Sequence, residues 1–223
     1  MRGRFQSDGS QLERYSRLVS VSEINSSFHR PHRRSTYERW ASAVPSGFAF
    51  SVKIPKTISH EKRCADCERE LKRFMDESAG LDTKRRLLLL QLPPSFAFDA
   101  SRMKRFFTFC RTIGAPRIVC EPRHASWFTT NAEALLSAQG VARVAADPAT
   151  DVHSPEPGGW SGLRYFRMHG TPRMYYSNYD DTALTTLAAR VRSAEVETWC
   201  IFDNTALGAA LGDALRLKSL LRT

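Results

Sequence analysis

The feature that most constrains the fold is a regular alternation of apolar, strand-like segments with segments of helical periodicity. Seven apolar segments have the length of a β-strand, and helical periodicity follows six of them. This alternation is typical of βα units, in which helices cover both faces of a parallel sheet. The sequence therefore predicts an α/β fold, with strands over residues 19–25, 48–55, 86–92, 117–123, 141–147, 163–170 and 197–204.

The helix boundaries are predicted from capping residues. Ser35, Asp99 and Asp180 stand where helices would begin, because their side chains can accept hydrogen bonds from free backbone amides. Gly114 and Gly140 stand where helices would end. A chain of 223 residues suits one domain, so we expect residues 1–223 to fold as a single unit. The expected helices are 35–44, 61–79, 99–113, 131–139, 180–194 and 205–221.

Two architectures fit this pattern, a doubly wound open sheet and a TIM-barrel-like (β/α) barrel. The sequence contains neither the G-x-G-x-x-G nor the G-x-x-x-x-G-K-[ST] motif that nucleotide-binding open sheets use. Nearly every predicted strand ends in polar or ionisable residues, which a barrel would gather at one mouth. An open sheet would spread them along an edge. We therefore favour the barrel.

The strand-end residues are the candidate site. Glu23, Glu121 and Asp147 are candidate catalytic carboxylates, and His124 and His169 are candidate proton-transfer groups, because imidazole titrates near neutrality. Cations at strand ends could clamp an anion. A network of salt bridges that only closes the top of the barrel is the structural alternative. The predicted substrate-binding residues are Asn25, Lys53, His60, Gln91, Arg123, Trp127, Arg167, Tyr176 and Asn204; Asp203 is a further strand-end carboxylate, and Trp127 could instead be a packing residue.

Cofactors and metals are not indicated by any motif. The histidines and carboxylates are scattered over several strands, so a divalent metal stays open, but neighbouring cations would compete with it. Five cysteines and no apolar leader predict a reducing, cytoplasmic location without disulfides. Cys64 and Cys67 form a single C-x-x-C within a charged stretch that we expect to be helical, which makes a redox or zinc site the less favoured interpretation.

The net charge of +10 raises nucleic acid or another anion as a partner. The basic residues are dispersed, without a block of five or six like charges, which favours an ordinary solvated surface over a nucleic-acid footprint. No apolar run approaches the roughly 18 residues of a membrane span, so we expect no membrane partner. Oligomeric state is not predicted.

Several of these segments together resemble the DUF72 family (YecE-like proteins). The resemblance extends from about Arg2 to the C-terminus and implies a TIM-barrel-like fold, but little chemistry, because the family is largely uncharacterised. The segments are Glu23-Ile-Asn-Ser-Ser-Phe28, Phe48-Ala-Phe-Ser-Val-Lys53, Ile58-Ser-His60, Gln91-Leu-Pro-Pro94, Glu121-Pro-Arg-His-Ala-Ser-Trp127 and Arg167-Met-His-Gly170.

The chain also departs from the family pattern. Members usually open with a strand similar to Gly-Thr-Ser-Gly-Trp-Ser-Tyr, which is absent. Either the start is assigned too far downstream or this member has lost that strand, and we expect seven strands in a barrel that lacks the first one. His29 stands where members often have Tyr, and Asp203 where many have Asn.

Two functional hypotheses follow from the strand-end residues. The first is an enzyme that acts on an anionic substrate, phosphorylated or derived from nucleic acid, by general acid–base chemistry. The second is a non-catalytic binding module for nucleic acid or a phosphorylated metabolite, whose affinity would fall steeply with salt.

Overall fold

Strands and helices alternate along the chain as the sequence predicts. The structure is a computed structural model that describes residues 9–149 and 155–222. All seven predicted strands are present, the fifth of them as two short strands. The strands are β1 (Val21–Ile24), β2 (Ala49–Lys53), β3 (Arg85–Gln91), β4 (Arg117–Glu121), β5 (Ala142–Arg143), β6 (Ala145–Asp147), β7 (Gly158–Gly159), β8 (Arg164–Met168) and β9 (Thr198–Phe202).

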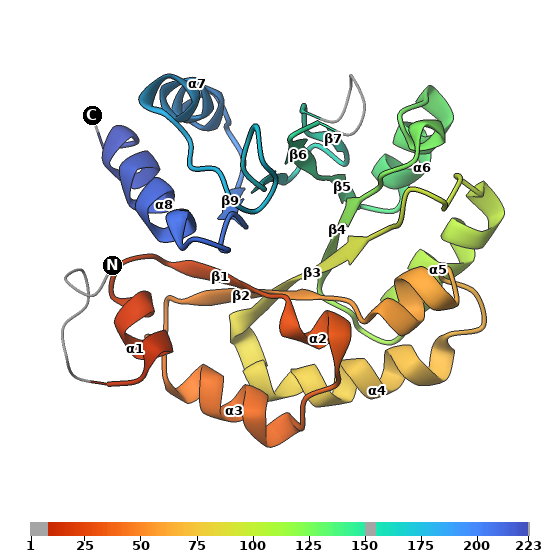
Figure 1. Ribbon diagram of the computed structural model, residues 1–223. Helices are drawn as coiled ribbons and strands as arrows, with labels where there is room; N and C mark the ends of the chain where they lie inside the picture. Colours follow the sequence, from red (N-terminus) through yellow and green to blue (C-terminus); the bar gives the residue numbers. More distant parts are fainter. Residues whose placement is uncertain (1–8, 150–154, 223) are drawn as a thin grey trace.

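The helices lie around the outside of the curved strands (Figure 1). All six predicted helices are present, and the sequence did not predict the short helices α1 and α2. The α-helices are α1 (Gln11–Ser16), α2 (Ser26–His29), α3 (Arg34–Ser42), α4 (Glu68–Ser78), α5 (Ala100–Thr112), α6 (Thr130–Ala138), α7 (Asp181–Arg192) and α8 (Ala209–Leu220). No helix among the described residues has the length and apolar character needed to cross a bilayer.

The strands form two sheets, which are mostly parallel. The first has the order β1-β2-β3-β4-β5-β7, and the second the order β6-β8-β9. Of the strands in the described part of the chain, only β7 runs antiparallel to its neighbour. Since Val144 alone separates β5 from β6, one short stretch of chain belongs to both sheets. The result is a mixed α/β fold in which the parallel strands end on the same side.

Successive residues of a strand alternate between two apolar cores. In β3, Leu88 and Leu90 pack in the cluster that also contains residues of α4 and α5. Leu87 and Leu89 pack in a second cluster, with Tyr165 of β8 and Trp199 of β9. Strands of both sheets therefore share the second cluster, which is called the inner core below, and the first cluster is called the outer core. The inner core lies next to the strand ends that hold the charged residues. A third cluster packs α7 and α8 against β6, β8 and β9.

Most of the predicted helix boundaries are confirmed. Asp99 and Asp180 accept hydrogen bonds from the amides of Arg102 and Ala183, at 2.9 and 2.8 Å. Gly114 and Gly140 follow α5 and α6 with φ of +68° and +67°. The Ser35 cap is wrong, because α3 begins at Arg34 with Arg33 in the cap position.

The predicted start of the second helix, at residue 61, is also wrong, although the helix itself is present as α4. A single π-turn covers Thr57–Glu61, and α4 begins only at Glu68. Between them Arg63, Cys64 and Asp66 have φ of 49°, 60° and 46°, a left-handed conformation incompatible with a continuous right-handed helix.

The C-x-x-C pair therefore lies in turns, with both of its cysteines free and buried. Burial raises the pKa of the Cys67 thiol to about 11, which makes it a weak nucleophile.

Candidate functional site

Arg167 organises the carboxyl ends of the strands. It lies on β8 with no exposed surface, and its guanidinium contacts carboxylates from three other strands or their ends. Nη2 and Nε donate to the two oxygens of Glu23 at 2.7 and 3.1 Å. Nη2 also donates to Asp203 Oδ2 at 3.0 Å, and Nη1 donates to Glu121 Oε2. Burial lowers the pKa of Arg167, but the three carboxylates outweigh it and raise that pKa, so the guanidinium is charged.

Glu121, at the end of β4, also contacts several charged and polar side chains. Its Oε1 accepts from Gln91 Nε2 at 2.8 Å and from Arg123 Nε and Nη2 at 3.1 and 3.0 Å. Gln91 and Glu121 are register partners on β3 and β4, which explains why these side chains meet. Burial raises the pKa of Glu121, but Arg167 and His169 bring it well below its usual range. Glu121 is therefore an ionised carboxylate fixed from several sides.

His169 lies between two carboxylates. Its Nε2 is 3.5 Å from Glu121 Oε1, and its Nδ1 is 3.3 Å from Asp203 Oδ2. Nδ1 is thus within ion-pair distance of Asp203, but the geometry of this contact does not qualify as a hydrogen bond. Burial lowers the pKa of His169, and the interactions with Asp203 and Glu121 outweigh it and raise that pKa. The two carboxylates therefore favour the protonated form of the imidazole.

Lys53, at the end of β2, differs from the other cations. Its side chain is almost fully buried, with 8% of the residue exposed, and its Nζ lies 4.1 Å from the centroid of the Phe28 ring. Within the described part of the chain, the ammonium forms no ion pair or hydrogen bond. Burial and the charge of Arg167 lower the pKa of Lys53 to about 8, although Glu121 and the other carboxylates oppose the shift. Among the described residues, Lys53 is thus an almost fully buried cation that contacts an aromatic ring and has no carboxylate within ion-pair distance.

Aromatic and imidazole rings lie near Lys53 and Arg123. The ring of His60 lies 4.9 Å from the Phe28 ring, and burial together with Lys53 and Arg123 lowers its pKa. Its Nδ1 lies 2.9 Å from Ser59 Oγ. Tyr175, which is 38% exposed, lies edge-on to His169 at 5.7 Å.

The structure brings together Glu23, Asn25, Lys53, Gln91, Glu121, Arg123, Arg167 and His169 from the predicted site, with His60 beside Lys53. Asn25 joins through a hydrogen bond from Nδ2 to Asp203 Oδ1 at 3.4 Å. These residues and Asp203 are called the Arg167 cluster below.

The other predicted site residues make contacts outside this cluster. His124 Nδ1 lies 2.9 Å from Ser126 Oγ, at the start of a short 3-10 turn. Asp147 accepts from Thr171 Oγ1 at 2.7 Å. Trp127 has no exposed surface and donates to the carbonyl of Phe96 at 2.9 Å, within the outer core. Tyr176 is 40% exposed, with the Arg173 guanidinium 3.9 Å from its ring centroid. Asn204 donates to Asp213 and to the Ser177 carbonyl.

Sequence reasoning missed Tyr165. Its hydroxyl donates to Glu23 Oε2 at 2.7 Å and thus fixes the carboxylate that Arg167 also binds. The signal was available, because Tyr165 and Arg167 are two residues apart on β8 and face the same side. An aromatic residue in the middle of a strand is typical of a core position, and the sequence does not indicate where its hydroxyl points.

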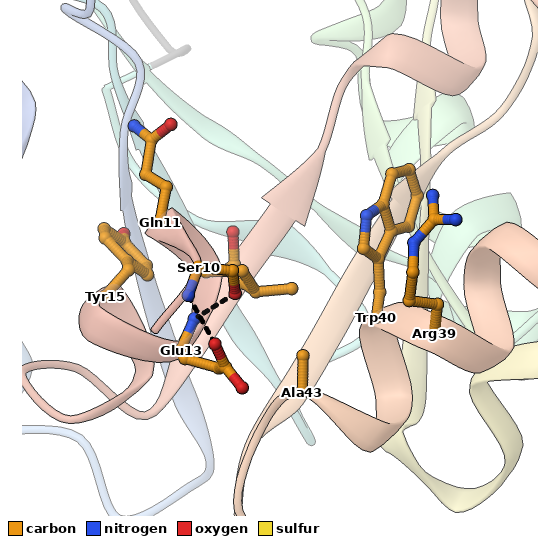
Figure 2. Close-up of a pocket in the computed structure, with 9 residues that line it drawn as sticks. Ser10, Gln11, Glu13, Tyr15, Arg39, Trp40 and Ala43 are labelled. Carbon is orange, nitrogen blue, oxygen red and sulfur yellow. Dashed lines mark hydrogen bonds between the residues drawn. The ribbon is translucent and has the colours of Figure 1, made fainter. Parts of the chain in front are cut away.

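The donors of the described residues do not favour a metal site. Residues 9–149 and 155–222 contain no group of three or more His, Cys, Asp or Glu side chains that could hold a metal ion. A cavity of about 630 Å³ lies between α1 and α3 (Figure 2), but no residue of the Arg167 cluster lines it. Two of its polar groups, Ser10 and Glu13, bond to each other in a capping box, so the cavity lacks the convergent charges of the cluster.

Comparisons with known proteins are consistent with the fold. A family model described as "Protein of unknown function DUF72" matches residues 3–223. Two crystal structures of the DUF72 family protein EF0366 from Enterococcus faecalis V583 are 20% identical to the chain, with TM-scores of 0.83 and 0.81. Both cover 96% of this chain, and the matches cover 89% and 94% of the other chain.

The DUF72 family protein TM1631 from Thermotoga maritima MSB8 is 24% identical, with a TM-score of 0.78. That match covers 92% of this chain and 85% of the other. Among curated proteins, none matches.

Proposed function

The chain belongs to the DUF72 family, whose function is unknown, and we propose from its site that it is an enzyme acting on an anionic substrate. The substrate would be a phosphorylated or nucleic-acid-derived compound, and the reaction general acid–base chemistry. The observation that supports this proposal is the contrast between Arg167, which three carboxylates satisfy, and Lys53, which has none. A buried cation without a partner is costly, and an anionic ligand would remove that cost.

In this proposal each charged group of the Arg167 cluster has a distinct role. Lys53 and Arg123 bind the anion, since the Arg123 side chain is 20% exposed and the Arg167 side chain is not exposed at all. Arg167 positions the carboxylates instead of binding substrate. His169, with its raised pKa, acts as the general acid, and Glu121 holds its imidazolium in place.

The proposal also includes a TIM-barrel-like arrangement of the strands. Counting β5 and β6 as one strand, seven parallel strands run from β1 to β9. Two contacts between the ends of this array support the arrangement: Asn25 after β1 bonds to Asp203 after β9, and Glu23 bonds to Arg167 of β8. The residues at the two outermost strands are thus close at their carboxyl ends, as a barrel mouth requires.

A thermal-melting screen tests the proposal. Inorganic phosphate, pyrophosphate and nucleotides are added to the wild-type chain, and a ligand at 100 times its Kd should add about 2.7 kcal/mol of stability. Lys53→Met should abolish the shift. Lys56→Met is the matched control, because Lys56 is exposed and pairs with Glu61 at 3.4 Å. The proposed anion site is wrong if no anion stabilises the wild type, or if Lys53→Met responds as the wild type does.

Turnover of each stabilising compound then separates an enzyme from a binding module. Phosphorus NMR follows the compound in the presence of wild type and of His169→Gln. An enzyme consumes it, and His169→Gln binds it but turns it over far more slowly. Binding by the wild type without consumption would instead establish the binding module.

A further inference from the structure

Lys53 has the environment of a reactive amine, beyond what anion binding requires. We propose that the Lys53 amine forms a protonated imine with the carbonyl carbon of an anionic aldehyde or ketone. This inference rests on the proposed function and names the substrate class of that same site. Its ammonium has no carboxylate within ion-pair distance among the described residues, so no ion pair has to break when Nζ reacts.

The first argument is the population of neutral amine. An ordinary lysine has a pKa of about 10.4, so at pH 7 fewer than about one in a thousand molecules has the free electron pair. The pKa of Lys53 is lowered to about 8, which makes roughly a tenth of it neutral at that pH. Burial beside Phe28 and repulsion from Arg167 are the causes, and both are built into the strand ends.

The second argument is the charge around the product. A protonated imine keeps the positive charge of the lysine, so the surroundings must tolerate that charge after water has left. The charged groups that act on Lys53 come from four strands or their ends: Arg167 disfavours its charge, and Glu121, Glu23 and Asp203 favour it. The carboxylates therefore stabilise the iminium as they stabilise the ammonium.

The third argument is a neutral base whose pKa responds to the charge of Lys53. His60 lies against the same Phe28 ring as Lys53, and its lowered pKa makes it a neutral base at pH 7. His60 can take one proton from the ammonium and later return it to the departing hydroxyl. The balance is Lys–NH3+ plus R2C=O giving Lys–NH+=CR2 plus H2O: one C–N bond forms, the C–O bond breaks, and no oxidant or reductant is needed.

Arg123 supplies the anionic half of this specificity. Its guanidinium is partly exposed and is held by Glu121, and with Lys53 it acts on the same His60 ring. A phosphate or carboxylate on Arg123 would bring the carbonyl of a short compound toward Lys53. The expected substrate class is therefore a keto acid or a phosphorylated aldehyde or ketone.

Reductive trapping tests the inference. Pyridoxal 5′-phosphate, an anionic aldehyde, is incubated with the full chain at pH 7, reduced with borohydride, and the modified lysine is identified by peptide mass spectrometry. Lys53 should be modified at least about tenfold faster than the other lysines because of its larger neutral fraction. Lys53→Arg should lose this modification, and Lys56→Arg should keep it. Pyridoxal, which lacks the phosphate, should react with Lys53 more slowly.

The outcomes separate this inference from the proposed function. Phosphate-dependent stabilisation without preferential labelling of Lys53 would overturn the imine and leave the anion site standing. Equal labelling of Lys53 by pyridoxal and pyridoxal 5′-phosphate, with no stabilisation by anions, would remove the anionic substrate and overturn the inference as stated. Preferential, phosphate-dependent labelling at Lys53 supports both.

Discussion

Replacing Arg167 by methionine should destabilise the protein by an amount that depends on pH. Methionine fills a similar volume without the charge, so the carboxylates lose their common partner. Glu121 keeps Arg123 and Gln91, and Asp203 keeps its contact with His169. Among the described residues, Glu23, whose side chain is 1% exposed, keeps only the hydroxyl of Tyr165.

The expected cost is dominated by this one stranded carboxylate. Breaking a buried ion pair by removing one partner costs about 3–5 kcal/mol. For a chain of this length that corresponds to a fall in Tm of roughly 6–20 °C. Urea unfolding at pH 7 measures the difference. Arg86→Met is the control, because the Arg86 side chain is 55% exposed and its exposed pair should contribute about 1 kcal/mol or less.

The pH dependence provides the stricter test. In the wild type, Glu121 and Asp203 have lowered pKa values, so they contribute stability above their unfolded values near 4 that is lost as the pH falls further. In Arg167→Met, protonation of the carboxylates near pH 4 removes the penalty of their buried charge. The two proteins should therefore differ most at pH 7 and converge near pH 4.

A second substitution tests whether the stranded charge of Glu23 causes the loss of stability. Adding Glu23→Gln to Arg167→Met removes the stranded charge, so the double variant should recover at least half of the lost stability. A difference that stays constant between pH 4 and pH 7, or a double variant no more stable than Arg167→Met, would refute the reasoning.

Three further predictions concern other members of the site. Tyr165→Phe removes a buried hydrogen bond to Glu23 and should cost about 1.5–3 kcal/mol in urea unfolding; a cost near zero would contradict the assigned bond. His169 has a raised pKa, so its contribution to stability is fully present below its unfolded value near 6.5 and is lost as the pH rises through the folded value. The urea midpoint of His169→Gln should therefore vary less than that of the wild type above pH 6.5, and parallel curves would rule this out. Lys53→Met should leave the unliganded protein as stable as the wild type or more so, because it removes an unpartnered buried charge; a Tm clearly lower than that of the wild type would show that the ammonium is satisfied.

Much of the fold could be predicted because β3 and its neighbours have local signals. The run from Leu87 to Leu90 is apolar throughout, and its residues pack alternately in two cores. Asp99 and Asp180 mark helix starts by a hydrogen bond to the backbone amide three positions later in the sequence. The segment around Cys64 could not be predicted, because its composition is helical while a left-handed backbone at three non-glycine residues turns the chain.

Most members of the Arg167 cluster could be predicted, but their pairing could not. Strand ends in a parallel α/β fold lie on one side, so Glu23, Glu121 and Arg167 were expected to meet. Which cation binds which carboxylate depends on strand order and curvature, and no short-range pattern encodes these. His124 and Trp127 follow Arg123 closely in sequence, but the chain turns after β4 and takes them into a capping contact and the outer core.

In the proposed function, the distribution of partners separates structural charge from charge that is available to a ligand. Arg167 has three carboxylates and no exposed surface, so adding an anion there would displace an existing bond and bring little gain. Lys53 already bears the cost of burial and loses no bond when an anion or a carbonyl carbon approaches. Under this proposal an anion gains more free energy at the Lys53 ammonium than at Arg167, and a neutral replacement of Lys53 costs the unliganded fold less than a neutral replacement of Arg167.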